Sequence, residues 1–91
     1  MLVIVAYDIP DDKRRLQLSN FLEGYGRRVQ ESVFECFMNL DQMRQLHKQT
    51  LLKVEPDEDN IRFYWLPTDG VEKVLTIGSP LPMTPPDAYI I

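Results

Sequence analysis

The chain has 91 residues, of which 44% are hydrophobic and 26% charged, and its formal net charge is −4 at pH 7. This length is enough for one domain with one core, so we expect residues 1–91 to fold as a single unit. No apolar run approaches the ~20 residues of a membrane span, and the first residues lack the basic segment of a secretory signal. We therefore expect a cytoplasmic protein with no membrane partner. A lone cysteine, Cys36, excludes an intramolecular disulfide and a multi-cysteine zinc site.

The charges are unevenly distributed along the chain. Residues 1–28 contain five cations and four anions, whereas from Glu55 onward seven acids face only Arg62 and Lys73. Charges further apart than ~8–10 Å are largely screened, so the local charge density matters more than the total. A basic patch in the first third of the chain can therefore bind phosphate although the whole chain is acidic.

The first predicted elements are a buried strand and an amphipathic helix. Residues 2–6 form an unbroken apolar run rich in β-branched side chains, which is typical of a central strand, and the run closes at Asp8. Apolar residues at helical spacing then predict a helix over 12–25. Asp11 and Asp12 are of the type that caps such a helix at its start.

The remainder of the fold is predicted from changes in periodicity. Residues 27–38 favour a strand, but their alternation changes phase, so we expect a bulge or a split into two strands near Ser32. A second amphipathic helix, capped by Asn39 or Asp41, is predicted from an apolar stripe that runs from Met43 to Val54, and strands are predicted over 61–66 and 71–77. The sequence therefore predicts an α+β domain in which two helices cover one face of a largely antiparallel sheet.

The C-terminal segment is predicted to leave the domain. Four of the seven prolines lie between Pro80 and Pro86, so residues 80–91 are expected to begin as an extended linker. The last four residues are apolar and favour a strand: Ala88, Tyr89, Ile90 and Ile91. Because such a segment needs a surface on which to dock, we expect it to pair with a sheet edge of a second copy, as an exchanged strand in a homodimer.

Asp8 is the candidate metal ligand and catalytic residue. A hard cation such as Mg²⁺ takes oxygen ligands and needs few protein carboxylates beside water, so one Asp8 from each of two subunits would suffice. Aspartate is also common as a simple cap where a strand ends, and the residue pattern alone favours that simpler interpretation.

Basic and aromatic residues suggest a nucleic-acid surface. Arg14 and Arg15 open the first helix, where cations oppose the helix dipole, so either a phosphate partner or a solvated basic turn accounts for them. Arg27 and Arg28 add positive charge at the start of a strand. The ring of Phe34 could stack on a base, although an aromatic residue in an apolar strand more often belongs to the core.

Three segments, taken together, resemble the CRISPR-associated Cas2 family. They read Tyr-Asp-Ile-Pro-Asp-Asp-Lys-Arg-Arg at 7–15, Tyr-Gly-Arg-Arg-Val-Gln-Glu-Ser-Val-Phe-Glu-Cys at 25–36, and Asp-Asn-Ile-Arg-Phe-Tyr at 59–64. No single segment is decisive, but their order and spacing cover nearly the whole chain and are specific.

The resemblance implies a ferredoxin-like homodimer with C-terminal strands exchanged between subunits. It also implies an endonuclease that uses Mg²⁺, or Mn²⁺, on RNA or double-stranded DNA, and that joins the Cas1 integrase in spacer acquisition. Asp8 matches the metal-binding aspartate of the family. The residues that match its nucleic-acid site are Tyr7, Arg15, Arg28, Ser32 and Phe34.

Three functions remain open from the sequence. The first is a Mg²⁺-dependent phosphodiesterase, and the second is a non-catalytic clamp that holds duplex DNA for the integrase. The third is a ferredoxin-like regulatory module that binds a small ligand, and the order of the motifs argues against it. Gln17 stands where some relatives place another basic residue, which weakens the expectation of strong phosphate binding.

Overall fold

The computed structural model describes residues 1–82 and contains one four-stranded sheet with the strand order β2-β3-β1-β4. The strands are β1 (Leu2–Asp8), β2 (Arg27–Gln30), β3 (Val33–Phe37) and β4 (Asn60–Leu66). The helices are α1 (Asp12–Leu22), α2 (Leu40–Leu51) and the short α3 (Thr68–Val71). The expected exchanged strand at 88–91 lies outside the described residues.

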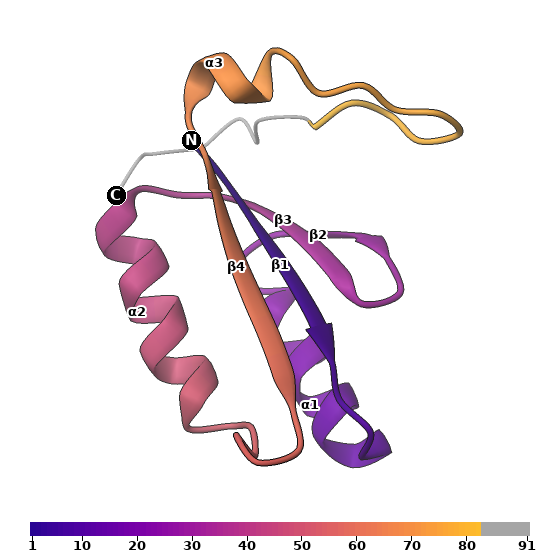
Figure 1. The fold of residues 1–91 in the computed structure, drawn as a ribbon, viewed down its shortest axis with the longest axis vertical. Helices are drawn as coiled ribbons and strands as arrows, with labels where there is room; N and C mark the ends of the chain where they lie inside the picture. Colours follow the sequence, from indigo (N-terminus) through magenta and orange to yellow (C-terminus); the bar gives the residue numbers. More distant parts are fainter. Residues whose placement is uncertain (83–91) are drawn as a thin grey trace.

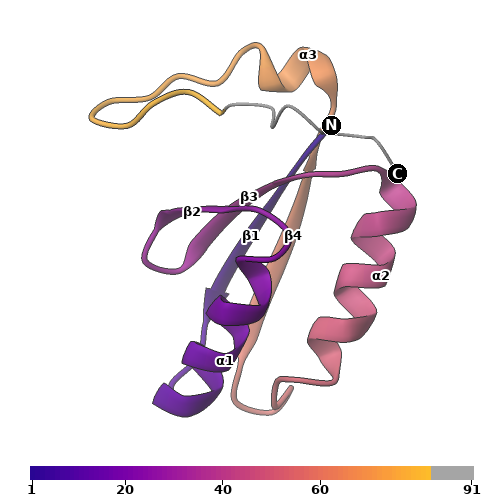
Figure 2. The ribbon, with the colours of Figure 1, turned by 180° about the vertical axis from the view of Figure 1, so that it is seen from behind.

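The arrangement of these elements is ferredoxin-like, as predicted. β1 is central and pairs antiparallel with β3 on one side and with β4 on the other, and β2 pairs antiparallel with β3. Both long helices lie on the same side of the sheet (Figure 1), and Figure 2 shows them from that side. No helix of residues 1–82 covers the opposite face of the sheet.

The core lies between the sheet and the two long helices. Successive residues of a strand point to opposite faces, and Val3, Val5 and Tyr7 of β1 point toward the helices. They pack with Leu18 of α1 and Leu46 of α2, and all five are buried. The intervening residues of β1 therefore face the uncovered side of the sheet.

The helix caps follow from local sequence. The Asp11 side chain accepts a hydrogen bond of 2.8 Å from the backbone N–H of Arg14 and begins α1. Asn39 and Gln42 form a capping box at the start of α2, with both bonds at 2.8 Å. α1 ends at Leu22, three residues earlier than predicted, because the N–H groups of Gly24 and Tyr25 bond to carbonyls three residues back, at Phe21 and Leu22, instead of four.

The predicted split of the strand over 27–38 is confirmed. β2 ends at Gln30 and β3 begins at Val33, with a register shift between Arg28 and Gln30. The turn into β2 passes very close to β3 at Gly26. A Cβ atom built there would lie 2.3 Å from the carbonyl oxygen of Glu35 and 2.5 Å from the sulfur of Cys36, so this approach requires glycine.

The predicted strand over 71–77 is wrong. After β4 the chain forms the helical turn α3, with backbone bonds from Val71 to the Pro67 carbonyl at 3.0 Å and from Glu72 to the Thr68 carbonyl at 3.2 Å. This turn directs the chain away from the sheet before residues 72–77 can pair with a strand, and Leu75 and Ile77 are left exposed. In residues 1–82 no helix is long and apolar enough to cross a membrane.

Candidate nucleic-acid and metal site

Asp8 lies at the C-terminal end of the central strand, on the face that none of the described helices covers. It is exposed and stands opposite Asn60 of β4 in the register of the sheet. Within residues 1–82 its carboxylate has no hydrogen bond or ion pair. Strand pairing on both sides of β1 fixes the backbone, so Asp8 is a free carboxylate on a rigid mount.

The fit of this site to a metal depends on ligands beyond one chain. The part of the chain that the structure describes contains no group of three or more His, Cys, Asp or Glu residues that could hold a metal ion. Mg²⁺ usually keeps several waters and binds through one or two carboxylates. Asp8 therefore supplies one carboxylate of the kind that Mg²⁺ binds, and the other ligands of such a site would come from outside residues 1–82 of one chain.

Tyr7, Arg15 and Arg28 are brought together in a pocket of about 180 Å³ at the edge of α1. The Arg15 guanidinium donates a hydrogen bond of 2.9 Å to the carbonyl of Ile9 and forms an ion pair with Asp12. Two guanidinium groups and a phenol around one cavity are donors of the kind that bind a phosphate, and the carboxylates of Asp12 and Glu31 line the same cavity.

The Tyr7 hydroxyl donates a hydrogen bond of 3.4 Å to the carbonyl of Glu31. Burial raises the pKa of Tyr7, and the positive charges of Arg28 and Arg15 partly offset that rise. Tyr7 is therefore a neutral phenol at neutral pH and can donate or accept a hydrogen bond at the floor of this pocket.

Phe34 is fully buried in the core. Its ring stacks on Tyr7 with a centroid distance of 6.4 Å, and the Arg28 guanidinium lies 5.6 Å from its centroid. The expectation that Phe34 stacks on a nucleic-acid base is corrected on this point, because its ring does not reach the surface. Phe34 instead supports the two residues that line the basic pocket.

Arg14 is engaged within the fold. Its guanidinium binds the carboxylate of Asp59 at 2.9 and 3.1 Å and that of Glu58 at 3.1 Å. The Asp59 side chain is fully buried, and the hydrogen bond from Arg14 lowers its pKa. The candidate role of Arg14 in nucleic-acid binding therefore competes with a structural role that the sequence did not reveal, since its partner lies 45 residues away.

Arg27 and Ser32 lie outside the basic pocket. Arg27 stands opposite Glu35 in the sheet, and their charged groups are 3.8 Å apart. Burial raises the pKa of Glu35, and Arg27 acts in the opposite direction. The carbonyl of Ser32 accepts a 3.0 Å bond from the N–H of Tyr7, which holds the strand junction beside β1.

Asp8 and the basic pocket lie on opposite faces of the sheet. Tyr7 and Asp8 are successive residues of β1, so their side chains point in opposite directions. Tyr7 lines the pocket with Arg15 and Arg28, whereas Asp8 is not among the lining residues. The sequence placed these residues in one site, but the structure separates the carboxylate from the two arginines.

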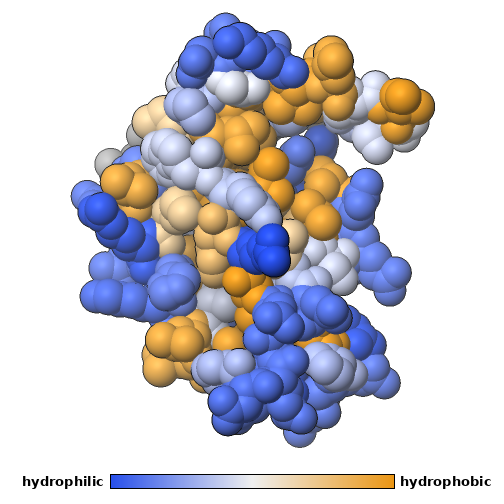
Figure 3. All heavy atoms as spheres, in the orientation of Figure 1, coloured by the Kyte–Doolittle hydropathy of each residue, from blue (hydrophilic) through white to orange (hydrophobic). Residues whose placement is uncertain are grey.

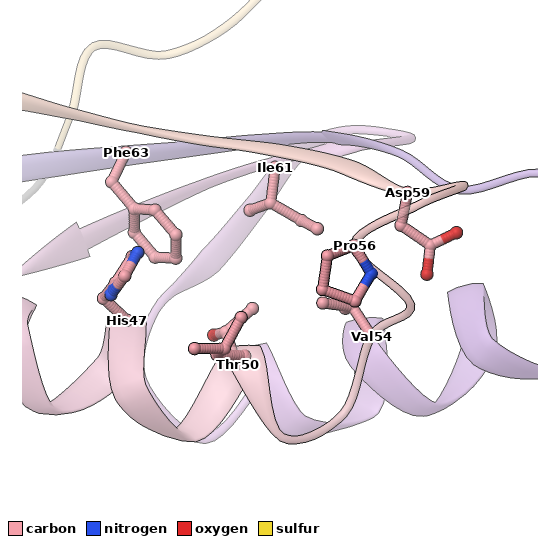
Figure 4. Close-up of a pocket in the computed structure, with 8 residues that line it drawn as sticks. His47, Thr50, Val54, Pro56, Asp59, Ile61 and Phe63 are labelled. Carbon is pink, nitrogen blue, oxygen red and sulfur yellow. The ribbon is translucent and has the colours of Figure 1, made fainter.

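A further pocket, of about 160 Å³, lies between α2 and β4. Figure 4 shows His47 and Thr50 of α2 facing Ile61 and Phe63 of β4 across it. His47 packs edge-on against Phe63 at a centroid distance of 5.5 Å. No lysine or arginine of residues 1–82 lines this pocket, so it does not resemble a phosphate site.

Comparison with known proteins identifies the family. The family model described as CRISPR associated protein Cas2 matches residues 1–74. A CRISPR-associated endoribonuclease Cas2 of Synechocystis sp. is 42% identical over 90 residues, covering 99% of this chain and 97% of the relative. A CRISPR-associated endonuclease Cas2 of Thermus thermophilus is 44% identical over 81 residues, covering 89% of this chain and 87% of the relative.

Solved structures agree with these relatives. The crystal structure of Streptococcus pyogenes Cas2 superposes with a TM-score of 0.74 at 31% identity, covering 86% of this chain and all of that one. A chain of a partial Cas6-RT-Cas1–Cas2 complex superposes with a TM-score of 0.71 at 37% identity, covering 88% of this chain and 93% of that one. With the fold, the family match and relatives that span the chain in agreement, the chain belongs to the CRISPR-associated Cas2 family.

Proposed function

We propose that this chain forms a homodimeric endonuclease that hydrolyses phosphodiester bonds in RNA or double-stranded DNA with a divalent cation held at Asp8. The observation that carries the proposal is the free Asp8 carboxylate at the end of β1, on the uncovered face of the sheet. Relatives named as an endoribonuclease and an endonuclease, at 42% and 44% identity, support this activity.

The second subunit is inferred from the uncovered face. Figure 3 shows a band of hydrophobic residues over the sheet on this side of the molecule. In the register of the sheet, Ile4 and Tyr64 stand opposite each other on this face; Ile4 is partly buried and Tyr64 is 46% exposed. A second copy that packs here by twofold symmetry would bury this band and bring the two Asp8 carboxylates toward each other.

The chemistry is then shared between the cation and the side chains of the protein. Mg²⁺, or Mn²⁺ in its place, would polarise the phosphate and lower the pKa of an attacking water. Two Asp8 carboxylates would hold that cation. Arg15, Arg28 and Tyr7 would bind a phosphate further along the same strand and keep the nucleic acid in position.

A second function, as a scaffold, is favoured by the separation of the basic pocket from Asp8. A pocket that binds backbone phosphates on the other side of the sheet can hold duplex DNA without contributing to cleavage. A chain 37% identical to this one occurs in a structure of a complex that includes Cas1. We infer that the protein also holds duplex DNA for the Cas1 integrase during spacer acquisition.

The test is a cleavage assay on labelled RNA and labelled duplex DNA, with Mg²⁺ and with a chelator. Asp8→Ala is compared with Asp41→Ala, which removes the same charge from an exposed site on α2. We expect cleavage with Mg²⁺ for the parent and for Asp41→Ala, and its loss in Asp8→Ala. Equal cleavage by Asp8→Ala would contradict the proposal. If the protein binds duplex DNA in a salt-dependent way but cleaves under no metal condition, the nuclease function is wrong and only the scaffold function remains.

A further inference from the structure

The uncovered face of the sheet contains few charged side chains. The register places Asp8, Arg62 and Glu35 on this face, because each stands opposite a residue of β1 or β4 that points there. Arg27, the partner of Glu35 in the sheet, shares the face and forms an ion pair with it. Among the strand residues that the structure describes, this pairing leaves Asp8 and Arg62 as the two unpaired charges, and they are of opposite sign.

Arg62 is a diagonal neighbour of Asp8. It stands opposite Ala6, two residues before Asp8 on β1, while Asp8 stands opposite Asn60. Diagonal neighbours on adjacent strands are ~7–8 Å apart, which is within the reach of an arginine side chain. Within residues 1–82 no carboxylate forms an ion pair with Arg62, and its side chain is exposed.

The Arg62 guanidinium is held in place by a neighbour on the same strand. Its NH1 group donates a hydrogen bond of 3.1 Å to the hydroxyl of Tyr64, which stands opposite Ile4 and therefore lies on the side of Arg62 away from Asp8. This bond raises the pKa of Arg62, so the group stays charged. A guanidinium has five N–H donors, so most of them remain available to a ligand.

The two arginines assigned to phosphate binding from the sequence do not share this face. Arg15 and Arg28 line the pocket on the helix side, with Tyr7. Among the strand residues that the structure describes, the cation nearest to Asp8 in the register of this face is therefore Arg62. A planar guanidinium matches two oxygens of one phosphate, which a lysine ammonium does not.

We propose that Arg62 binds the non-bridging oxygens of the phosphate that is cleaved at Asp8, and that the Tyr64 hydroxyl holds its guanidinium on the uncovered face of the sheet. This inference rests on the proposed function and adds a substrate contact to it. Arg62 would be a catalytic residue in contact with the substrate, and Tyr64 a positioning residue. A charge of this kind beside a reacting phosphate stabilises the charge that develops in the transition state.

The test separates cleavage from binding. Cleavage is measured under single-turnover conditions at saturating RNA or duplex DNA for Arg62→Ala, Arg62→Lys and Tyr64→Phe, with Lys73→Ala as the charge control outside the sheet. We expect a loss of roughly 100-fold for Arg62→Ala, in the range known for lost transition-state donors. Arg62→Lys and Tyr64→Phe are expected to show smaller losses, and Lys73→Ala none.

Binding is measured as fluorescence anisotropy of the same RNA and duplex across a range of salt concentrations, with Arg62→Ala introduced into an Asp8→Asn background. The variant should bind more weakly and lower the salt slope by about 1, the contribution of one phosphate contact. If the parent cleaves neither substrate, the proposed nuclease function is wrong, and the binding measurement alone then tests whether Arg62 contacts a phosphate. The inference is overturned if Arg62→Ala matches Lys73→Ala in both measurements, or if its single effect is loss of the dimer in light scattering.

Discussion

Arg14 on α1 and Asp59 in the turn before β4 are joined by two hydrogen bonds, one from Nε to Oδ2 at 2.9 Å and one from a terminal nitrogen to Oδ1 at 3.1 Å. The same Asp59 carboxylate accepts the backbone N–H of Glu55 at 2.8 Å. The next residue, Asn60, is the register partner of Asp8. The pair therefore fixes the start of α1 and the start of β4 at the end of the sheet where Asp8 lies.

Asp59→Asn is expected to lower the free energy of unfolding at pH 7 by about 2 kcal/mol, because a charged acceptor of several hydrogen bonds is lost. The hydrogen bond from Arg14 lowers the pKa of Asp59 below its ordinary value of 3.8. The stabilisation is therefore present above that value and is lost as the pH falls through the lower pKa of the folded state. Urea unfolding at pH 7 and at pH 3 measures this, and a difference that stays constant or grows on acidification would contradict it.

Gly26→Ala is expected to destabilise the fold by at least about 2 kcal/mol, because its Cβ would overlap the backbone of β3. Gly70→Ala is the matched control, since the nearest atom to its Cβ, on Pro67, is at an ordinary contact distance of 3.6 Å. The midpoint of thermal unfolding should fall clearly for Gly26→Ala and change little for Gly70→Ala. Equal midpoints in the two variants would show that β3 yields to the added atom.

The secondary structure was predictable wherever local pattern decides it. The apolar run of β1, the helical spacing of α1 and the change of phase near Ser32 each depend on neighbouring residues, and each prediction is confirmed. The sequence could not show that residues 71–77 do not form a strand, because these residues favour a strand only where the edge of a sheet is available to pair with. Whether the chain reaches an edge is decided by α3. This helical turn has four residues, which are too few to show a helical spacing of apolar side chains in the sequence.

The candidate site was predictable in its residues but not in its grouping. Alternation along β1 separates Tyr7 from Asp8, yet which face the helices cover depends on pairing between distant strands. The pairing of Arg14 with Asp59 and the place of Arg62 beside Asp8 depend on the same long-range register. A single sequence shows the residue types and the periodicity of apolar residues. It does not show the pairing register of distant strands, which brings the site residues together.

Charge reversal in the basic pocket tests nucleic-acid binding. Arg15→Glu and Arg28→Glu should each weaken binding of duplex DNA for all sequences, and each should lower the salt slope by about 1 or more. Arg44→Glu is the matched control, because Arg44 is an exposed cation on α2. The affinity and its salt dependence are measured by fluorescence anisotropy of labelled duplexes at salt concentrations from about 50 to about 200 mM. Sequence-dependent binding that ignores salt would count against the pocket.

A charge placed on the uncovered face tests the dimer. Ile4→Glu puts a carboxylate in the centre of the hydrophobic band over β1, where a second copy would have to bury it unpaired. Light scattering at micromolar concentration should show a dimer for the parent and a monomer for Ile4→Glu, with unchanged circular dichroism. Leu52→Glu, at a position that is 86% exposed after α2, should remain dimeric. A monomeric parent would refute the shared site.

The most direct measurement of the central claim is a titration with Mn²⁺ followed by electron paramagnetic resonance. If one Asp8 from each subunit holds a shared cation, the parent should bind one ion for every two chains. Asp8→Asn keeps the size of the side chain but removes its charge, so this binding should be lost while the dimer remains. Asp41→Asn, on the exposed surface of α2, should bind as the parent does. Binding of one ion per chain, or equal binding by Asp8→Asn, would contradict the account.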